Sequence, residues 1–172
     1  MAVRLTHAMI KDALSEACGA DVLPLVEKLK NTKNFSEFKL ADVLGQDVNY
    51  TRNQLYRLLK HNLVSFIRRK DKRKGWYIYY WTFRTKQVRF LIKSQKEDRL
   101  KRLQDWLHRE EEGQFFSCKK GCMRTSFDSA VDLNYTCPEC GEILQLEDNA
   151  VQIKGIKEKI KELDDFLKKY DA

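Results

Sequence analysis

The sequence predicts an α+β protein in which a helical N-terminal domain with a β-hairpin is joined by a long helix to a small cysteine-rich module and a terminal helix. Apolar residues recur at helical spacing up to residue 61, two short apolar segments then enclose a charged turn, and four of the five cysteines lie between residues 118 and 140. Helical periodicity followed by alternation around a turn indicates helices and then a hairpin. The expected parts are residues 1–85 for the first domain, 86–112 for the linker helix, 113–148 for the cysteine module and 149–172 for a C-terminal amphipathic helix.

Four helices are expected ahead of the hairpin. The first ends at Gly19, and the next three are expected to be capped by side chains that accept hydrogen bonds from first-turn amides, namely Asp21, Ser36 and Asn49. The fourth helix runs to about His61. Three or four helices followed by a two-stranded ribbon with a charged tip is the arrangement of an extended winged helix.

The predicted hairpin combines positive charge with aromatic rings. Residues 63–69 and 76–83 are the expected strands, and the turn between them has the sequence KDKRKG. Lys and Arg side chains at a hairpin tip can neutralise phosphates, and aromatic rings can stack on unpaired bases. Alternatively, the charges only solvate a loop and the rings face the core, which is the interpretation that we favour for Ile78, Tyr80 and Phe83. The candidate contact residues are Arg69, Lys70, Lys72, Arg73, Lys74, Trp76 and Tyr77.

The fourth helix offers a second candidate surface. Its polar face carries Asn53 and Arg57, whose side chains are able to hydrogen-bond to base edges. Helix faces of this composition are commonly just solvated, and no second recognition element is evident. Asn53 and Arg57 are therefore candidates for nucleic-acid or polymerase contact, with simple solvation as the alternative.

Two pairs of cysteines predict a metal site. The first pair has three intervening residues and the second pair has two, and Gly121 and Gly141 permit turns that direct backbone amides toward the sulfurs. Four thiolates saturate a tetrahedral Zn²⁺ and leave no position for a reactive water, so one structural zinc ion is expected in a zinc ribbon. A redox pair and an iron–sulfur centre are the alternatives. The candidate ligands are Cys118, Cys122, Cys137 and Cys140.

Charge is distributed unevenly along the chain, whose net charge is +8. Residues 1–83 contain 15 Lys and Arg against 8 Asp and Glu, whereas residues 113–148 contain 3 against 6. An acidic surface repels phosphate, so we expect the cysteine module to contact protein rather than DNA. A small basic patch of Lys119, Lys120 and Arg124 is the feature of the module that would suit a nucleic-acid backbone.

The last helix carries an apolar seam. Six apolar residues recur at alternating steps of three and four, as in the a and d positions of a coiled coil. The seam predicts either an intramolecular helical pair or a partner subunit. The linker helix is polar on every side in its middle, which is typical of a helix that bridges two domains. The seam residues are Ile153, Ile156, Ile160, Leu163, Leu167 and Tyr170.

No pattern indicates catalysis or a membrane. No Gly-rich phosphate loop, nucleophile with a base or recognisable carboxylate pair occurs, so we expect a protein that is not an enzyme. No apolar run approaches the roughly 20 residues of a membrane helix, and the N-terminus lacks the apolar core of a secretory signal. Paired cysteines without such a signal are typical of metal binding in a reducing, cytoplasmic compartment.

The stretch NYTRNQLYRLLKHNLVSFIRRKDKRKGWYIYYWTF at residues 49–83 resembles the winged helix of archaeal transcription factor E, the homologue of the alpha subunit of eukaryotic general transcription factor IIE. A four-cysteine ribbon after a linker helix is similar to the same family, so the resemblance covers nearly the whole chain. One departure is the first cysteine pair, because many ribbons have two intervening residues where this chain has three.

The resemblance implies a basal transcription initiation factor. Such a factor binds the clamp and stalk of RNA polymerase in a preinitiation complex that also holds promoter DNA, TATA-binding protein and transcription factor B. There it promotes promoter opening and stabilises the non-template single strand, so that residues 69–77 would lie near that strand or the clamp tip. The same resemblance implies an archaeal, cytoplasmic protein that associates with the nucleoid during initiation, and a second subunit bound through the C-terminal helix is a further candidate partner.

An alternative from another functional class is a sequence-specific winged-helix repressor. It would dimerise through the terminal seam, read a closed operator with residues such as Arg57, and use zinc only as structural support. The two hypotheses differ in the first partner, which is polymerase for the initiation factor and duplex DNA for the repressor.

Overall fold

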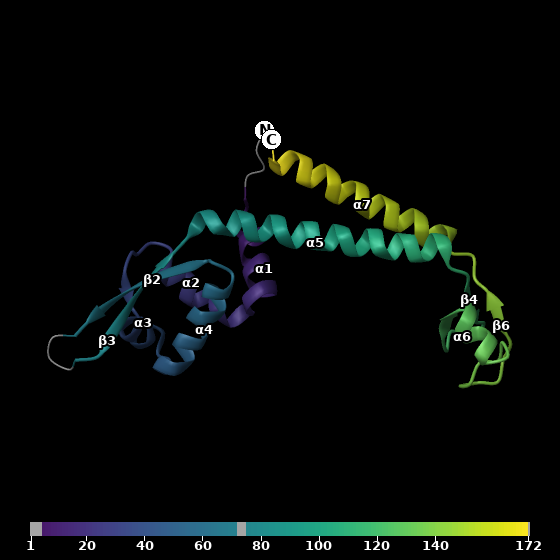
Figure 1. The fold of residues 1–172 in the computed structure, drawn as a ribbon, viewed down its shortest axis with the longest axis horizontal. Helices are drawn as coiled ribbons and strands as arrows, with labels where there is room; N and C mark the ends of the chain where they lie inside the picture. The colour runs from purple at the N-terminus through teal and green to yellow at the C-terminus, as the bar shows by residue number, and fades with distance from the viewer. Residues whose placement is uncertain (1–4, 72–74, 172) are drawn as a thin grey trace. The chain divides into compact units, whose positions relative to one another are not determined.

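The computed structural model describes residues 5–71 and 75–171 of the chain. It shows a mixed helix-and-sheet protein that divides into two compact units, residues 2–95 and residues 96–172. The boundary falls inside one long helix, α5 (Thr85–Glu112), which Figure 1 draws in teal and green. Within the described residues, none of the helices is both long enough and apolar enough to cross a membrane.

The N-terminal unit packs its helices against a three-stranded antiparallel sheet. The strand order is β1-β3-β2, so β3 lies in the middle. The largest buried side chain is Trp81 on β3, and Leu14, Leu25, Leu40 and Leu58 of the helices are also fully buried. The elements are α1 (His7–Cys18), a 3-10 turn η1 (Ala20–Val22), α2 (Leu23–Leu29), β1 (Phe35–Ser36), α3 (Glu37–Leu44), α4 (Val48–Lys60), β2 (Val64–Lys70) and β3 (Tyr77–Phe83).

Helix ends follow local chemistry, with three corrections. Helix α1 ends at Gly19, whose φ of 93° suits glycine. Ser36 occupies the N-cap position of α3 as expected, but its side chain accepts no hydrogen bond from the first-turn amides. Helix α4 is capped by Asp47 and not by Asn49, because the Asp47 carboxylate, two residues earlier, accepts hydrogen bonds from the first-turn amides. Asp21 caps no helix, since it lies in the 3-10 turn and its carboxylate binds other side chains.

Strand β1 is a feature that the sequence did not indicate. Phe35 pairs with Trp81 and Ser36 with Tyr80, which extends the hairpin to a third strand. Two residues are too short for any periodic pattern, and their pairing depends on a strand more than 40 residues away. The third strand leaves β2 as an edge of the sheet, which keeps the hairpin accessible on that side.

The C-terminal unit contains a second small sheet between two helices. Its strand order is β5-β4-β6, and its core consists of Cys118, Ala130, Cys137 and Leu144. The short helix α6 within the module was not expected, since only strands were predicted between the cysteine pairs. After the end of α5 the elements are β4 (Phe115–Cys118), β5 (Arg124–Ser126), α6 (Phe127–Asp132), β6 (Leu144–Leu146) and α7 (Ala150–Asp171).

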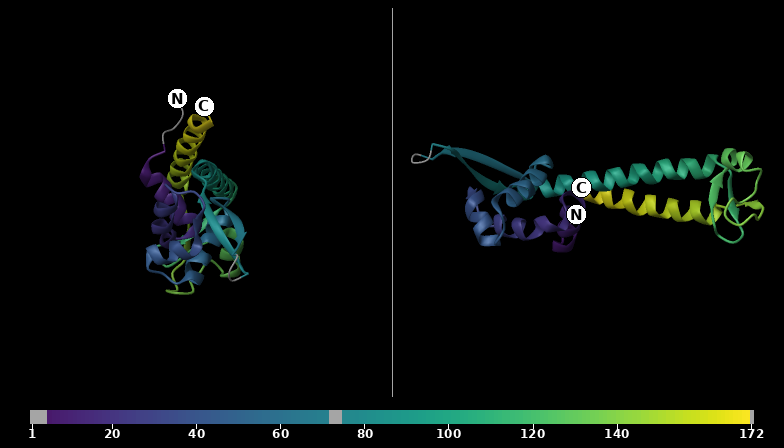
Figure 2. Two further views of the ribbon diagram at one scale, coloured as in Figure 1. Left: turned by 90° about the vertical axis from the view of Figure 1, so that its left-hand side faces the viewer. Right: turned by 90° about the horizontal axis from the view of Figure 1, so that it is seen from below.

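Helix α7 returns along the C-terminal half of α5, and the two helices lie side by side in Figures 1 and 2. Lys157, near the start of α7, pairs with Glu111 at a distance of 2.6 Å. Near the other end of α7, the Phe166 ring lies 5.9 Å from the Lys96 ammonium, so the pair is antiparallel. Of the two outcomes that the seam predicts, this unit shows the intramolecular pair.

Candidate nucleic-acid and metal sites

The register of the hairpin assigns each side chain to one of its two faces. Phe66 lies opposite Trp81, Arg68 opposite Tyr79, and Lys70 opposite Tyr77. Directly opposed residues of an antiparallel pair project to the same side of the sheet. These six residues therefore form one face of the hairpin, which we call the aromatic face. It carries one ring and two cations along β2 and three rings along β3.

Ring contacts hold the aromatic face together. The Phe66 ring centroid lies 5.1 Å from that of Trp81 and 5.2 Å from that of Tyr79, and Tyr56 from α4 approaches Trp81 edge-on at 6.1 Å. The Arg68 guanidinium lies 4.9 Å from the centroid of the Tyr77 ring. Trp81 is buried, whereas Phe66 is 41% exposed, so the cluster is anchored at its base and open to solvent above.

Phe66 and Tyr79 are absent from the candidates chosen from the sequence. Side chains alternate between the two faces of a strand, so Phe66 lies on the same face as Arg68 and Lys70. Once the pairing register of β2 and β3 is known, Tyr79 is assigned to that face as well. The opposite face of the hairpin carries Ile67, and Arg69 lies there over the Tyr80 ring at 5.7 Å.

The candidate residues near the tip differ in their surroundings. Trp76 and Tyr77 are about half exposed, and Arg69 and Lys70 are exposed on β2. Of the residues assigned to the core, Phe83 is buried, whereas Tyr80 is only half-buried, as is Ile78. Three candidate cations, Lys72, Arg73 and Lys74, lie outside the described residues.

Arg57 is bound within the N-terminal unit. Its guanidinium donates a 2.7 Å hydrogen bond to the Cys18 carbonyl and forms an ion pair with Asp21. The Asp21 carboxylate also accepts hydrogen bonds from the Gln54 amide and the Tyr50 hydroxyl. The hydrogen bond from Arg57 lowers the pKa of Asp21 to about 2. A DNA base would have to displace these partners, while Asn53 on the same helix is exposed.

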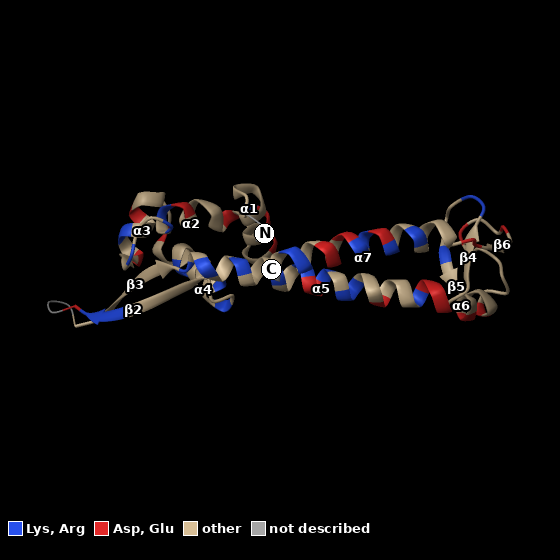
Figure 3. Ribbon diagram, turned by 90° about the horizontal axis from the view of Figure 1, so that it is seen from above, with Lys and Arg blue, Asp and Glu red and all other residues tan. Residues whose placement is uncertain are grey.

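The N-terminal unit as a whole is strongly cationic. Residues 2–95 contain 19 Lys and Arg against 8 Asp and Glu. Figure 3 shows basic residues concentrated on β2, where the aromatic face lies. Cations that neutralise phosphates supply most of the affinity for nucleic acid, so this unit has both the charge and the rings that single-stranded nucleic acid requires.

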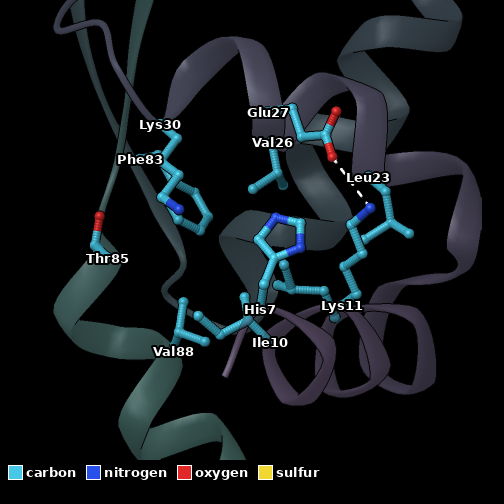
Figure 4. A pocket seen from close by; sticks show the side chains of 11 residues that line it. His7, Ile10, Lys11, Leu23, Val26, Glu27, Lys30, Phe83, Thr85 and Val88 are labelled. Carbon is cyan, nitrogen blue, oxygen red and sulfur yellow. Dashed lines mark ion pairs between the residues drawn. The ribbon is translucent and has the colours of Figure 1, made fainter. Parts of the chain in front are cut away.

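The N-terminal unit also contains a small apolar cavity (Figure 4). Its volume is about 30 Å³, and its walls include Ile10, Val26 and Val88. The Lys11–Glu27 ion pair, with a distance of 3.4 Å, lies at its edge. Small-molecule sites usually enclose roughly 300 Å³ or more, so this cavity has room only for a group the size of part of a side chain.

The four cysteines of the C-terminal unit converge on one point. Their sulfurs lie within 4.8 Å of one another, and the Cys118 and Cys140 sulfurs are 3.4 Å apart. A tetrahedral ion with bonds of about 2.3 Å places its sulfurs roughly 3.8 Å apart, so the donor set fits zinc in number, chemistry and spacing. Gly121 and Gly141, with φ of 74° and 72°, make the two turns.

The four sulfurs lie close enough to perturb one another's pKa. The Lys120 backbone amide donates toward Cys118 and lowers the pKa of that thiol to about 7. The nearby Cys140 sulfur and burial raise the pKa of Cys122 to about 12. Four thiolates at this spacing repel one another, and a divalent cation removes that repulsion. The convergence of four sulfurs on one point is suited to holding an ion with all four thiolates.

The basic patch predicted on the module is largely neutralised. Lys120 pairs with Glu142 at 3.0 Å, and the Arg124 guanidinium is bound by Glu110 and Glu147. Among the described residues, Lys119 is the patch cation for which no ion pair is found. Two cations of the patch are therefore already paired with carboxylates and are less available to a nucleic-acid backbone.

The sequence matches the family model of the TFIIE alpha subunit over residues 8–112. The match covers the whole sheet of the N-terminal unit, including the aromatic face, and runs to the last residue of α5. The chain belongs to the TFIIE alpha subunit family. Membership in this family places the chain among general transcription factors, as the resemblance of the hairpin segment implied.

Relatives named Transcription factor E extend the similarity over the cysteine module. The protein of Metallosphaera sedula is 32% identical over 160 residues, which cover 92% of this chain and 91% of the relative. That of Thermococcus kodakarensis is 33% identical over 165 residues, covering 95% and 89%. That of Methanobrevibacter smithii is 36% identical over 154 residues, covering 87% and 88%. This member of the TFIIE alpha subunit family therefore resembles its archaeal relatives along both units.

Proposed function

We propose that this chain is a general initiation factor that joins RNA polymerase at the promoter, promotes opening of the DNA and stabilises the non-template strand of the bubble. Its place in the TFIIE alpha subunit family supports the initiation role. Its relatives are named as transcription factors, which favours a protein without catalysis of its own. In this proposal the polymerase performs the chemistry, and the factor shifts the equilibrium toward the open promoter.

The observation that carries the proposal is the aromatic face of the hairpin. We assign the N-terminal unit to the winged-helix class, with the hairpin as its wing. The exposed rings of Phe66 and Tyr77 and the half-buried ring of Tyr79 offer surfaces for unpaired bases, and Arg68 and Lys70 on the same face are able to meet phosphates. Bases in closed duplex DNA are already stacked on each other, so such a face favours the open form.

A structural zinc ion is proposed for the four cysteines. Cys118, Cys122, Cys137 and Cys140 would hold it, and the ion would supply the folding energy that the small core of the module lacks. With four thiolates around one divalent ion the module gains further negative charge, so we expect it to bind protein. The clamp and stalk of polymerase are the proposed partners, in a complex with TATA-binding protein and transcription factor B.

A second subunit could bind only the part of the α7 surface that is not buried against α5. Ile156 and Tyr170 of the seam are buried within the C-terminal unit. An additional partner would therefore bind the outer side of α7, where Val151 is exposed, or would have to separate the helical pair first.

Two adjacent residues on opposite faces of β2 provide a matched test. Phe66 and Ile67 are each 41% exposed, but only Phe66 belongs to the aromatic face. Stacking of a base on an aromatic ring contributes roughly 1–3 kcal/mol. Phe66→Ala is therefore expected to lower promoter opening about fivefold or more, as measured by a fluorescent base analogue in the non-template strand of a reconstituted complex. Ile67→Ala is expected to change it less than twofold.

Two controls accompany this comparison. Thermal unfolding checks that both variants fold, and polymerase affinity is expected to stay within twofold of the parent protein. Equal losses of opening for the two variants, or a loss of polymerase binding that accounts for the lost opening, would show that the ring is a packing residue. The double variant Trp76→Ala, Tyr77→Ala extends the same test toward the tip.

The repressor alternative makes the opposite prediction for closed DNA. It requires a defined footprint on a duplex operator and loss of that footprint on Arg57→Ala. The ion pair of Arg57 with Asp21 favours the initiation factor, because the guanidinium already has partners within the unit. A tight footprint by the isolated chain, with no effect on promoter opening, would reverse this preference.

A further inference from the structure

Glu110 is a buried carboxylate at the place where three segments of the C-terminal unit meet. It lies in the last turn of α5 and is 2% exposed. The first strand of the cysteine module follows α5 directly, and α7 begins after the module ends. A carboxylate with so little exposure needs compensating charge and hydrogen bonds.

The partners of Glu110 come from all three segments. Arg124, the first residue of β5, donates to both carboxylate oxygens, with Nη1–Oε1 and Nη2–Oε2 distances of 3.1 and 2.7 Å. The Trp106 indole, one turn earlier on α5, donates to Oε1 at 2.9 Å. The Asn149 amide, just before α7, donates to Oε2 at 3.0 Å and to the Glu110 backbone carbonyl at 2.7 Å.

Arg124 transmits this anchoring into the module. Its Nε donates to the Glu147 carboxylate at 2.8 Å, beyond the end of β6. Its guanidinium also covers the Phe115 ring, 3.9 Å from the centroid, on β4. One planar guanidinium from β5 thus contacts a residue on β4 and a residue beside β6, and it binds the helix through a two-point contact. Such a contact fixes angle as well as distance.

Glu111 shows what an ordinary carboxylate does in the same turn. It is exposed, and the structure pairs it with Lys157 at 2.6 Å. That contact joins α5 to α7 and involves no residue of the cysteine module. Ion pairs of this exposed kind contribute little to stability. Glu110 and Glu111 therefore differ in their connection to the module while sharing charge, size and helix.

We propose that Glu110 is a positioning residue that fixes the orientation of the cysteine module, residues 114–148, relative to the α5–α7 pair. Apart from these contacts, the module is connected to the helices by the chain at residues 113 and 148 and by a 3.3 Å hydrogen bond from the Gln152 amide of α7 to Glu147. The contacts of Glu110 hold the module, and with it the acidic surface of the module, in one orientation. This inference rests on the proposed function in one respect only, which is that the fixed orientation presents the module to polymerase.

The experiment compares Glu110→Gln with Glu111→Gln in the full, zinc-loaded chain. Residual dipolar couplings of backbone amides report whether the module and the helical pair share one alignment tensor. We expect one shared tensor for the parent chain and for Glu111→Gln. For Glu110→Gln we expect separate tensors and a degree of order for the module that falls about twofold. A shared, unchanged tensor in Glu110→Gln would overturn the proposal.

Cobalt substitution separates loss of orientation from loss of folding. If Glu110→Gln keeps the thiolate-to-cobalt charge-transfer band of the parent, its metal site is intact and any change in order is one of orientation. If the band is lost as well, Arg124→Lys provides the second variant, because it keeps the positive charge but not the two-point contact. Arg124→Lys is expected to lower the order of the module with the band retained, and an unchanged order there contradicts the proposal.

Polymerase binding distinguishes this inference from the proposed function. Glu110→Gln is expected to weaken polymerase binding severalfold relative to Glu111→Gln. If the couplings show a mobile module but polymerase affinity is unchanged, Glu110 positions the module and the assigned use of that position is wrong. If the parent chain itself does not bind polymerase, the proposed function fails while the couplings still decide the role of Glu110.

Discussion

The Asp21 side chain connects the turn between α1 and α2 to helix α4. Its carboxylate binds Arg57 and accepts hydrogen bonds from Gln54 and Tyr50, all three on α4. Asp21 itself lies in the turn between α1 and α2. Its partner Arg57 also donates a hydrogen bond to the Cys18 carbonyl at the end of α1. The cluster therefore ties α4 to the junction of the first two helices.

The first prediction concerns acid stability. The hydrogen bond from Arg57 lowers the pKa of Asp21 from 3.8 to about 2. Because the folded-state value is the lower one, the stabilisation is present above about pH 4 and is lost as the pH falls toward 2. Asp21→Asn should therefore destabilise the N-terminal unit at neutral pH by about 1 kcal/mol or less, since the pair is partly exposed. The difference from the parent chain should shrink between pH 4 and pH 2.

Urea unfolding followed by the NMR signal of the Trp81 indole measures this difference. Trp81 is fully buried in the N-terminal unit, so its signal reports on that unit alone. Asp12→Asn is the control, because Asp12 is exposed and the structure records no ion pair for it among the described residues. A gap between the parent chain and Asp21→Asn that stays constant from pH 7 to pH 2 would contradict the assigned role.

At the scale of elements, the packing of α7 against α5 depends on the apolar seam of α7. Ile156 is 2% exposed, whereas Val151, one and a half turns earlier, is 82% exposed. Ile156→Ala should destabilise the helical pair by roughly 2–5 kcal/mol, since it removes buried methyl groups and leaves a cavity. Val151→Ala should change stability by less than about 0.5 kcal/mol.

Amide hydrogen exchange along α7 measures both variants. Exchange in the seam region should accelerate strongly in Ile156→Ala and remain at the parent rate in Val151→Ala. Protection that falls equally in both variants would mean that α7 is not held by the seam. The hairpin amides serve as an internal reference, because β2 and β3 belong to the other unit.

At the scale of the whole molecule, the two units have separate cores and opposite charges. The buried core of the N-terminal unit includes Trp81, and that of the module includes Cys118 and Cys137. Residues 2–95 carry an excess of 11 positive charges from 19 cations and 8 anions, and residues 113–148 carry an excess of 3 negative charges. This separation is consistent with one unit for nucleic acid and one for protein.

Metal removal tests the independence of the units. A chelator should unfold residues 114–148, because their buried core is too small to fold without an ion. The N-terminal unit should keep its cooperative transition, with an unchanged Trp81 signal and midpoint. Thermal unfolding and amide exchange with and without chelator provide the measurement. A single joint transition that moves with zinc would show that the units fold as one.

Features that depend on neighbours in the chain were predictable from the sequence. The end of α1 at Gly19 follows from the conformational freedom of glycine, and the two strands of the hairpin follow from period-two patterning around a charged turn. The convergence of the four cysteines follows from their paired spacing. The cap of α4 was misplaced because Asp47 and Asn49 offer the same local chemistry, and only the backbone geometry distinguishes them.

Only the tertiary structure decided the partners of charged and aromatic side chains. Arg57 is bound by Asp21, which lies 36 residues earlier in the chain, and Arg124 is bound by Glu110, so neither cation has the free guanidinium that its position on a polar surface suggested. The aromatic face likewise needed the register that places Phe66 beside Tyr79 and Trp81. Such pairings form between segments far apart in sequence, where packing rather than local propensity determines which groups meet.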